Sequence, residues 1–145
     1  MFRKYRDKLH KINCLTNELN ALYHRAALKL DMSDSGMTVM YMLADKGGNY
    51  PLHNICIESG VSKQTVNSAI RNLEEKGLIY LEKTKGKNKQ VFLTPEGENY
   101  SDKTVKRLIA AECAVFKNWS EEETDLYIKL TEKYCNSLKK QIEIM

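Results

Sequence analysis

The stretch LHNICIESGVSKQTVNSAIRNLEEKGLIYLEKTKGKNKQVFLTPEG, residues 52–97, decides the fold of this chain. Its first part is a short helical segment that ends before Gly60, a residue that permits a sharp turn. A second helix is expected to begin at Ser62, because serine is a favoured N-cap residue, and to end at Gly77. Its buried stripe is expected at helical spacing, on Val66, Ala69, Ile70 and Leu73. This order of elements predicts a helix-turn-helix.

A short β-ribbon is expected after the second helix. Residues 78–81 and 90–93 have the composition of strands, and the turn region between them, 84–88, contains Gly86. The tip of this ribbon carries four lysines, Lys83, Lys85, Lys87 and Lys89. A basic ribbon beside a helix-turn-helix can reach the backbone or the minor groove of a DNA duplex that holds the helix in its major groove.

The exposed face of the second helix has side chains that suit DNA. These candidate DNA-binding residues are Ser62, Lys63, Gln64, Thr65, Asn67, Ser68 and Arg71. Asparagine and glutamine can pair with adenine, arginine with guanine, and small hydroxyl groups with phosphates. In the ribbon, Lys85, Lys87 and Lys89 are expected to bind phosphates and release counterions. A solvated helix face would look similar, and lysines also protect edge strands from aggregation. The DNA interpretation therefore depends on the helix and the ribbon occurring together.

The remaining helices are expected to complete a single domain of 145 residues. Periodic apolar residues and helix-breaking residues predict helices over residues 2–30, about 37–44, 51–59, 95–118 and 120–145. Thr94-Pro95 and the capping box Ser120–Glu123 begin the last two. The expected fold class is mainly α with a small β-ribbon (α+β). A winged helix-turn-helix lobe at about 36–94 is expected between dimerisation helices at about 2–30 and 95–145.

The two ends of the chain carry apolar stripes. In the first helix the stripe includes residues at seven-residue steps, Tyr5, Ile12, Leu19 and Ala26. In the last helix one side carries Tyr127, Leu130, Tyr134 and Leu138. Packing within one chain is the alternative, but two long amphipathic ends exceed what a small lobe can cover and favour a homodimer.

The composition is that of an ordinary soluble protein. The chain has 23 Lys and Arg against 19 Asp and Glu, so its net charge of +4 is less informative than where the lysines lie. No apolar run approaches the roughly 20 residues of a membrane span, and the N-terminus does not read as a secretory signal. The four cysteines, at positions 14, 56, 113 and 135, show no metal-ligand spacing. They are expected to be reduced and mostly buried, in a cytoplasmic protein without disulfides or a membrane partner.

The sequence has no residue pattern typical of an enzyme. It contains no activated nucleophile, no paired acid and base, and no phosphate-cradling glycine loop. Its histidines, His10, His24 and His53, are scattered and form no cluster with cysteines. We therefore expect no catalytic activity, no cofactor and no metal site.

Three segments resemble the MarR family of bacterial winged-helix regulators, namely ESGVSKQTV at 58–66, LEEKGLI at 73–79 and VFLTPEG at 91–97. The order of the expected elements matches that family over essentially the whole chain. The resemblance implies an obligate homodimer that binds a pseudo-palindromic operator, more often as a repressor than as an activator. It also implies that a small ligand or an oxidant changes the DNA affinity. The chain departs from the family in the wing, where Lys85 and Lys87 replace the usual Asp-x-Arg pair.

The resemblance also suggests two regulatory sites. Tyr23 and His24 are the candidates for effector binding, in the cleft that family effectors often use between the dimer layer and the winged lobe. Cys14 lies in the first helix, where some peroxide-sensing relatives have a reactive thiol, with His10 and Lys11 one turn away. Plain helical packing is the alternative for Cys14. For the whole protein, the alternative is a winged-helix module that binds another protein and no specific DNA.

Overall fold

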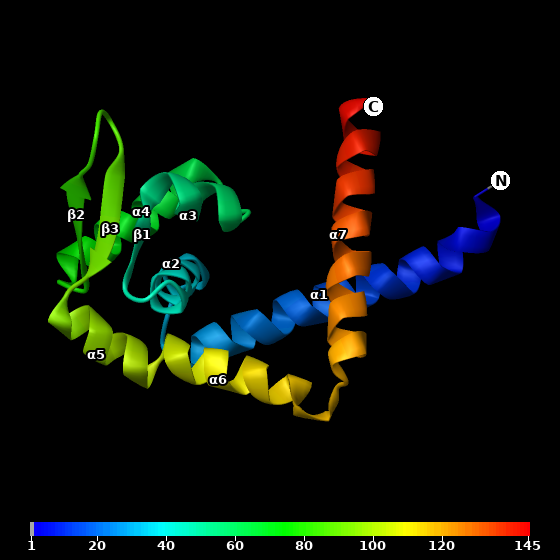
Figure 1. The fold of residues 1–145 in the computed structure, drawn as a ribbon, viewed down its shortest axis with the longest axis horizontal. Coiled ribbons are helices and arrows are strands. Elements are labelled where there is room, and N and C mark those ends of the chain that lie inside the picture. The colour runs from blue at the N-terminus through cyan, green and yellow to red at the C-terminus, as the bar shows by residue number, and fades with distance from the viewer. Residues whose placement is uncertain (1) are drawn as a thin grey trace. The chain divides into compact units, whose positions relative to one another are not determined.

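The computed structural model describes residues 2–145 and is built mainly from helices (Figure 1). In chain order the elements are α1 (Arg3–Lys29), α2 (Asp34–Asp45), β1 (Asn49–Pro51), α3 (Leu52–Glu58), α4 (Lys63–Glu75), β2 (Ile79–Lys83), β3 (Lys89–Leu93), α5 (Pro95–Lys103), α6 (Val105–Val115), the 3₁₀ helix η1 (Phe116–Asn118) and α7 (Glu121–Glu143). The expected α+β class and the winged helix-turn-helix are confirmed. The chain divides into two compact units, Met1–Ile109 and Ala110–Met145. That all 145 residues form one domain stays a prediction.

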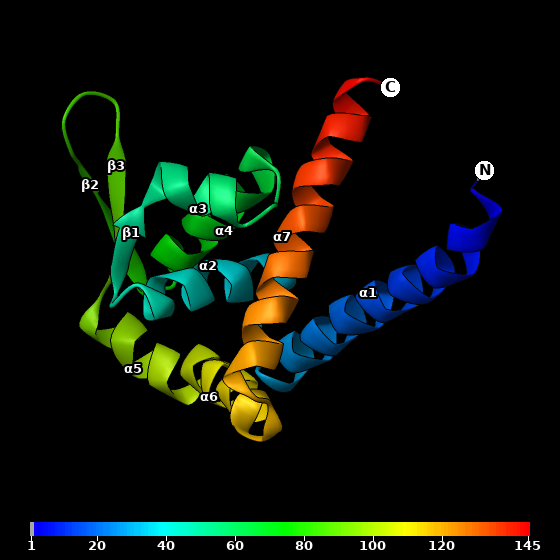
Figure 2. The same ribbon diagram turned by 45° about the vertical axis from the view of Figure 1, so that its right-hand side comes forward.

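The first unit is organised around a core shared by α2, the helix-turn-helix and the sheet. Met40 and Leu43 of α2, Ile55 of α3 and Val91 of β3 have no exposed surface, and Val66 of α4 is 1% exposed. Burial of apolar surface on this scale is the main favourable term in folding. Figure 2 shows α3 and α4 beside the ribbon of β2 and β3. The core thereby fixes α3, α4 and the ribbon relative to one another.

The sheet has a third strand that the sequence pattern does not indicate. Its order is β1-β3-β2, with both pairs antiparallel, and Tyr50 of β1 faces Val91 of β3. β1 has three residues and ends at Pro51, so it is too short to show the alternation that marks a strand. The ribbon strands occur where expected, although β2 begins at Ile79 instead of Leu78 and extends to Lys83.

The start of α2 corrects the expected boundary at Met37. The helix begins at Asp34, because the Ser33 Oγ accepts a hydrogen bond from the Gly36 backbone N–H at 3.0 Å and caps it. Gly36, which lies just before the expected start, is in the first turn of the helix. A Cβ at this position would approach the capping Ser33 Oγ to 2.8 Å. The glycine therefore leaves room for the cap instead of ending the helix.

The expected helix over 95–118 is wrong as a continuous element. α5 ends at Lys103, and Thr104, with φ −123° and ψ −95°, separates it from α6. The Thr104 hydroxyl donates a hydrogen bond to the Tyr100 carbonyl at 2.7 Å, which gives the backbone an alternative to helical bonding. Neither glycine nor proline marks this break, so the sequence gives no local signal for it.

The terminal helices show apolar residues on their surfaces. On α1 the exposed ones are Phe2 just before the helix, then Tyr5, Leu9, Ile12, Leu15, Leu19, Leu22, Tyr23 and Leu28. On α7, which has no buried residue, they are Leu126, Tyr127, Ile128, Leu130, Tyr134, Leu138 and Ile142. The expected capping box at Ser120 and Glu123 is confirmed at the start of α7. Within residues 2–145, no helix combines the length and the apolar character that crossing a membrane requires.

The expectation that the cysteines are mostly buried is wrong. Cys14, Cys113 and Cys135 are exposed, Cys56 is half-buried, and all four are free thiols. All four lie in helices, as expected. Three of those helices, α1, α6 and α7, have large surfaces that no other part of the described chain buries, so a helical position does not imply a buried side chain.

Candidate nucleic-acid interface

A serine cap fixes the start of α4. The Ser62 Oγ accepts a hydrogen bond from the Thr65 backbone N–H at 3.2 Å, and the two hydroxyl oxygens lie 2.8 Å apart. Such a cap satisfies one of the free N–H groups of the first turn and is typically worth about 1 kcal/mol. The expected N-cap is confirmed. Ser62 and Thr65 are therefore held at the end of the helix from which base-reading residues usually project.

One face of α4 is buried and the opposite face is exposed. The buried residues are those expected from the sequence: Val66, Ala69, Ile70 and Leu73. The exposed candidates for DNA binding on the helix are Lys63, Gln64, Thr65, Ser68 and Arg71. Asn67 is half-buried, and Arg71 donates a hydrogen bond to the Ser68 Oγ at 3.3 Å. These polar side chains can meet a ligand without any change in the core.

The ribbon ends in a turn that carries the lysines. Lys83 faces Lys89 in the register of β2 and β3, and the Thr84 backbone N–H donates to the Asn88 carbonyl at 2.9 Å. Gly86 has φ +75°, a conformation that L side chains rarely adopt, and so permits the turn. Like charges directly opposite one another in a ribbon repel. A bound anion would relieve this repulsion.

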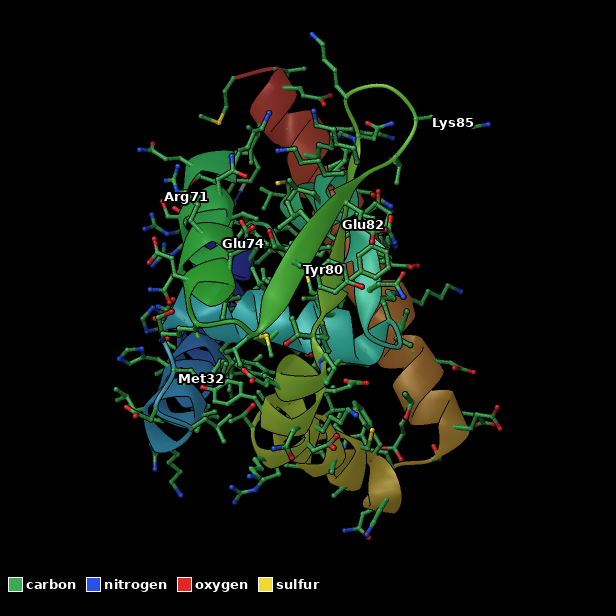
Figure 3. All side chains as sticks on the ribbon, turned by 90° about the vertical axis from the view of Figure 1, so that its left-hand side faces the viewer. Met32, Arg71, Glu74, Tyr80, Glu82 and Lys85 are labelled. Atoms are coloured by element: carbon green, nitrogen blue, oxygen red, sulfur yellow. The ribbon has the colours of Figure 1, made fainter. Side chains whose placement is uncertain are left out.

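The ribbon lysines point in different directions. Lys89 and Val91 are two residues apart on β3 and therefore share one face of the sheet, the face that Val91 buries in the core. Lys85 instead extends from the loop at the tip, away from α4, on which Arg71 and Glu74 lie (Figure 3). The tip therefore presents cations both towards the helices and outward.

A groove of about 560 Å³ lies between α3, α4 and the ribbon, and we call it the α3–α4–ribbon groove. Its lining residues are Leu52, His53, Cys56, Ile57, Lys63, Asn67, Lys87, Asn88 and Lys89. The groove thus brings together four predicted DNA-binding residues, Lys63 and Asn67 from α4 with Lys87 and Lys89 from the ribbon. The other predicted residues lie outside its lining, namely Ser62, Gln64, Thr65, Ser68, Arg71 and Lys85.

The groove is cationic. Three lysines, Lys63, Lys87 and Lys89, line it, and no aspartate or glutamate does. None of these lysines forms an ion pair within residues 2–145. An anionic ligand would therefore meet uncompensated positive charge here.

The contribution of α3 to the groove does not follow from the motifs in the sequence. Ile55 is the buried residue of α3. His53 and Ile57, four residues apart, share the face opposite Ile55 and line the groove. The helical spacing of the segment already indicates that His53 and Ile57 share one face. Only the position of the ribbon, however, shows that this face of α3 borders a groove.

The two effector candidates lie elsewhere. The His24 Nδ1 is 2.9 Å and 3.0 Å from the two carboxylate oxygens of Asp34, so this pair joins α1 to the start of α2. Both side chains are more than half exposed. Tyr23 is an exposed residue of α1, and neither Tyr23 nor His24 lines the α3–α4–ribbon groove.

Cys14 lies on the exposed surface of α1. Its Sγ is 3.6 Å from the His10 Nε2, one turn earlier in the same helix. Among residues 2–145, no group of three or more His, Cys, Asp or Glu side chains is placed to hold a metal ion.

Comparison with known proteins gives a family and a fold. Residues 25–107 match the family described as MLPTv-like, helix-turn-helix domain. No curated protein matches the chain. Among solved structures, a MarR-family regulator from Neisseria meningitidis is similar at a TM-score of 0.84 and 19% identity, over 94% of this chain and 96% of the other.

Two further structures share the fold and were solved with ligands. One is a MarR-family protein from Listeria monocytogenes in complex with a 26mer DNA, with a TM-score of 0.69 and 18% identity over 92% of this chain and 89% of the other. The second is NadR in complex with 4-hydroxyphenylacetate, with a TM-score of 0.69 and 15% identity over 86% and 89% of the two chains. The resemblance to MarR-family regulators is therefore confirmed at the level of the fold.

Proposed function

This chain belongs to the MLPTv-like helix-turn-helix domain family, and on that premise we propose that it is a sequence-specific regulator of transcription that binds double-stranded DNA as a homodimer. The α3–α4–ribbon groove is the observation that carries this proposal. Lys63 and Asn67 of α4 line the same cavity as Lys87 and Lys89 of the ribbon. A recognition helix and a wing that share a cationic groove can hold one DNA strand between them.

In this proposal α4 enters the major groove of the duplex. Its 13 residues follow the Ser62 cap, and its exposed face provides amide, hydroxyl and cationic groups. Gln64 and Asn67 can pair with adenine edges, and Arg71 can pair with a guanine. Ser62 and Thr65 are partly occupied by the cap, so we assign them to phosphate contacts near the helix start.

The ribbon contributes affinity more than sequence recognition. Lys87 and Lys89 line the groove, whereas Lys85 extends from the tip of the loop. Each phosphate that a lysine neutralises releases a counterion and makes binding weaker at high salt. A lysine is a flexible point charge, so we expect the wing to contact the backbone with little preference for the base sequence.

The terminal helices support the homodimer. α7 has no buried residue, and Ala27 is the buried residue of α1. Leu19 on α1 is 46% exposed, and Leu130 on α7 is 53% exposed. Apolar stripes of this length are costly in water, and a second copy of the chain would cover them. A symmetric dimer would present two copies of α4 to the two halves of a pseudo-palindromic operator.

A small ligand is the proposed signal that changes DNA binding. NadR, which shares this fold, was solved with 4-hydroxyphenylacetate. We propose that this chain is likewise a ligand-responsive repressor, acting on the chromosome in the bacterial cytoplasm, with Tyr23 and His24 as candidate effector contacts. Oxidation of the exposed Cys14 is a second candidate signal.

Selection of bound duplexes from a random-sequence pool tests the proposal directly. We expect enrichment of an inverted repeat with half-sites about 10 bp apart, because successive major grooves on one side of B-DNA are one helical turn apart. Binding should weaken steeply with salt. If neither the selected nor the random duplexes bind at low salt, the cationic groove serves another purpose. The chain would then be better described as a winged-helix module that binds proteins.

A further inference from the structure

His53 lies in the first turn of α3 and lines the α3–α4–ribbon groove with three lysines. Its side chain is exposed and forms no hydrogen bond or ion pair within residues 2–145. Imidazole is the side chain that exchanges its proton near neutral pH. Besides its three lysines, the groove therefore contains an imidazole, which can take up a proton when an anion binds beside it.

The charged groups around His53 determine how an anionic ligand would affect the protonation of its imidazole. The titratable groups on the elements that pack against α3 are Lys63, Arg71, Glu74 and Glu75 on α4, Lys89 on β3 and Tyr50 on β1. Cys56 and Glu58 lie on α3 itself, and Lys87 lies in the loop of the ribbon. Those that line the groove with His53 are the three lysines and the Cys56 thiol. A phosphate placed among them would bring negative charge next to the imidazole. Compared with the free protein, this favours the protonated form.

We propose that His53 is a third DNA contact, from α3, which binds a backbone phosphate and takes up a proton as it does so. The inference rests on the proposed function, since it takes the groove to be the place where a DNA strand lies. If the bound complex holds more protons than the free partners, the DNA affinity must rise as the pH falls. A charge-assisted hydrogen bond to phosphate is strong enough for an increase of about tenfold.

The test uses random-sequence duplex DNA, because a phosphate contact does not depend on the bases. Fluorescence anisotropy at fixed, low salt gives the dissociation constant of the full chain between about pH 7.5 and 6, a window below the titration of ordinary thiols and above that of carboxylates. We expect wild-type protein to bind about tenfold more tightly at the lower pH. His53→Gln, which keeps a hydrogen-bond donor but no titrating charge, should remove most of that difference.

Two further variants make the result specific. His53→Arg places a permanent cation at the position and should bind tightly at both pH values. His10→Gln changes a histidine outside the groove and should keep the wild-type pH dependence. Circular dichroism of each variant shows whether the fold is intact, and His53 is an exposed residue whose substitution leaves the core unchanged.

The outcomes separate the two proposals. DNA binding with a pH dependence that is absent, or unchanged in His53→Gln, would overturn the role of His53 and leave the proposed function standing. Failure of the wild-type protein to bind any duplex at low salt would overturn the proposed function, and the role of His53 with it. A pH dependence that is lost in His53→Gln and replaced by uniformly tight binding in His53→Arg is the result we expect.

Discussion

α4 and α7 are both amphipathic helices, but they differ in where their apolar faces are covered. α4 has 13 residues, and its apolar stripe is buried within the chain, with Leu73 4% exposed. α7 has 23 residues and none is buried, with Leu130 53% exposed. Since both faces are apolar, the difference lies in the partner surface. We infer that one chain encodes the winged lobe completely, whereas α7 depends on a second surface.

Leu130→Glu is expected to have the largest effect, because Leu130 lies on the exposed apolar face of α7. A carboxylate in an apolar helix interface cannot be paired or hydrated, so we expect the proposed dimer to dissociate into monomers. Sedimentation velocity measures the species, and circular dichroism reports whether the winged lobe is retained. Lys129→Glu, a charge change at the neighbouring position, is the control and should stay dimeric. A wild-type protein that sediments as a monomer at every concentration would contradict the role given to α7.

Leu43→Ala should destabilise each chain by itself. Leu43 is fully buried in α2, so its truncation should lower the free energy of unfolding by about 2–5 kcal/mol. Because this contact lies within one chain, urea unfolding should show a loss that does not depend on protein concentration. Leu130→Ala, by contrast, should give a loss that changes with concentration. Equal concentration dependence in the two variants would argue against a self-contained lobe.

The difference between contacts within one segment and contacts between distant segments explains how much of the structure the sequence predicts. Local signals identify α4 and α7 well, because their caps involve residues only three positions apart. Ser62 caps α4, and Ser120 with Glu123 forms the capping box of α7. Gly77, at φ +73°, ends α4 where the sequence predicts. Each of these features depends on one short segment.

Features that depend on distant segments are the ones that the sequence pattern misses. β1 becomes a strand only by pairing with β3. His53 lines the groove because the ribbon lies across from α3. The exposure of Cys14 follows from the absence of a covering element on α1 within residues 2–145, which helical periodicity alone does not report. Tertiary context decides all three. The break at Thr104 is local, but neither glycine nor proline marks it.

Ser62→Ala should destabilise the start of α4 without changing the core. Loss of the hydrogen bond between its Oγ and the Thr65 backbone N–H should cost about 1 kcal/mol of stability. The first turn of α4 should also fray, so DNA affinity should fall. Urea unfolding and anisotropy with duplex DNA measure the two effects. Ser68→Ala, which changes an exposed serine of the same helix, should leave the stability nearly unchanged.

Lys87→Ala tests whether the groove and the helix act together. Removing one phosphate contact should flatten the slope of log affinity against log salt by about one unit. The free energy of unfolding should be unchanged, because Lys87 is exposed and forms no ion pair. Lys103→Ala, on α5 and outside the groove lining, is the charge-matched control. Equal changes of slope in the two variants would mean that the groove has no special part in DNA binding.

Ser101→Ala is expected to have the smallest effect, and it tests the packing beside α5. The Ser101 hydroxyl on α5 is buried and is the one buried side-chain polar atom without a partner in the described chain. Ser101→Ala should therefore raise the free energy of unfolding by up to about 1 kcal/mol, because it removes an unsatisfied polar group. Thr104→Val, which deletes the hydroxyl that donates to the Tyr100 carbonyl, should instead cost about 1 kcal/mol. A loss of stability in Ser101→Ala would instead indicate that its hydroxyl is hydrogen-bonded in solution, for example to a water molecule.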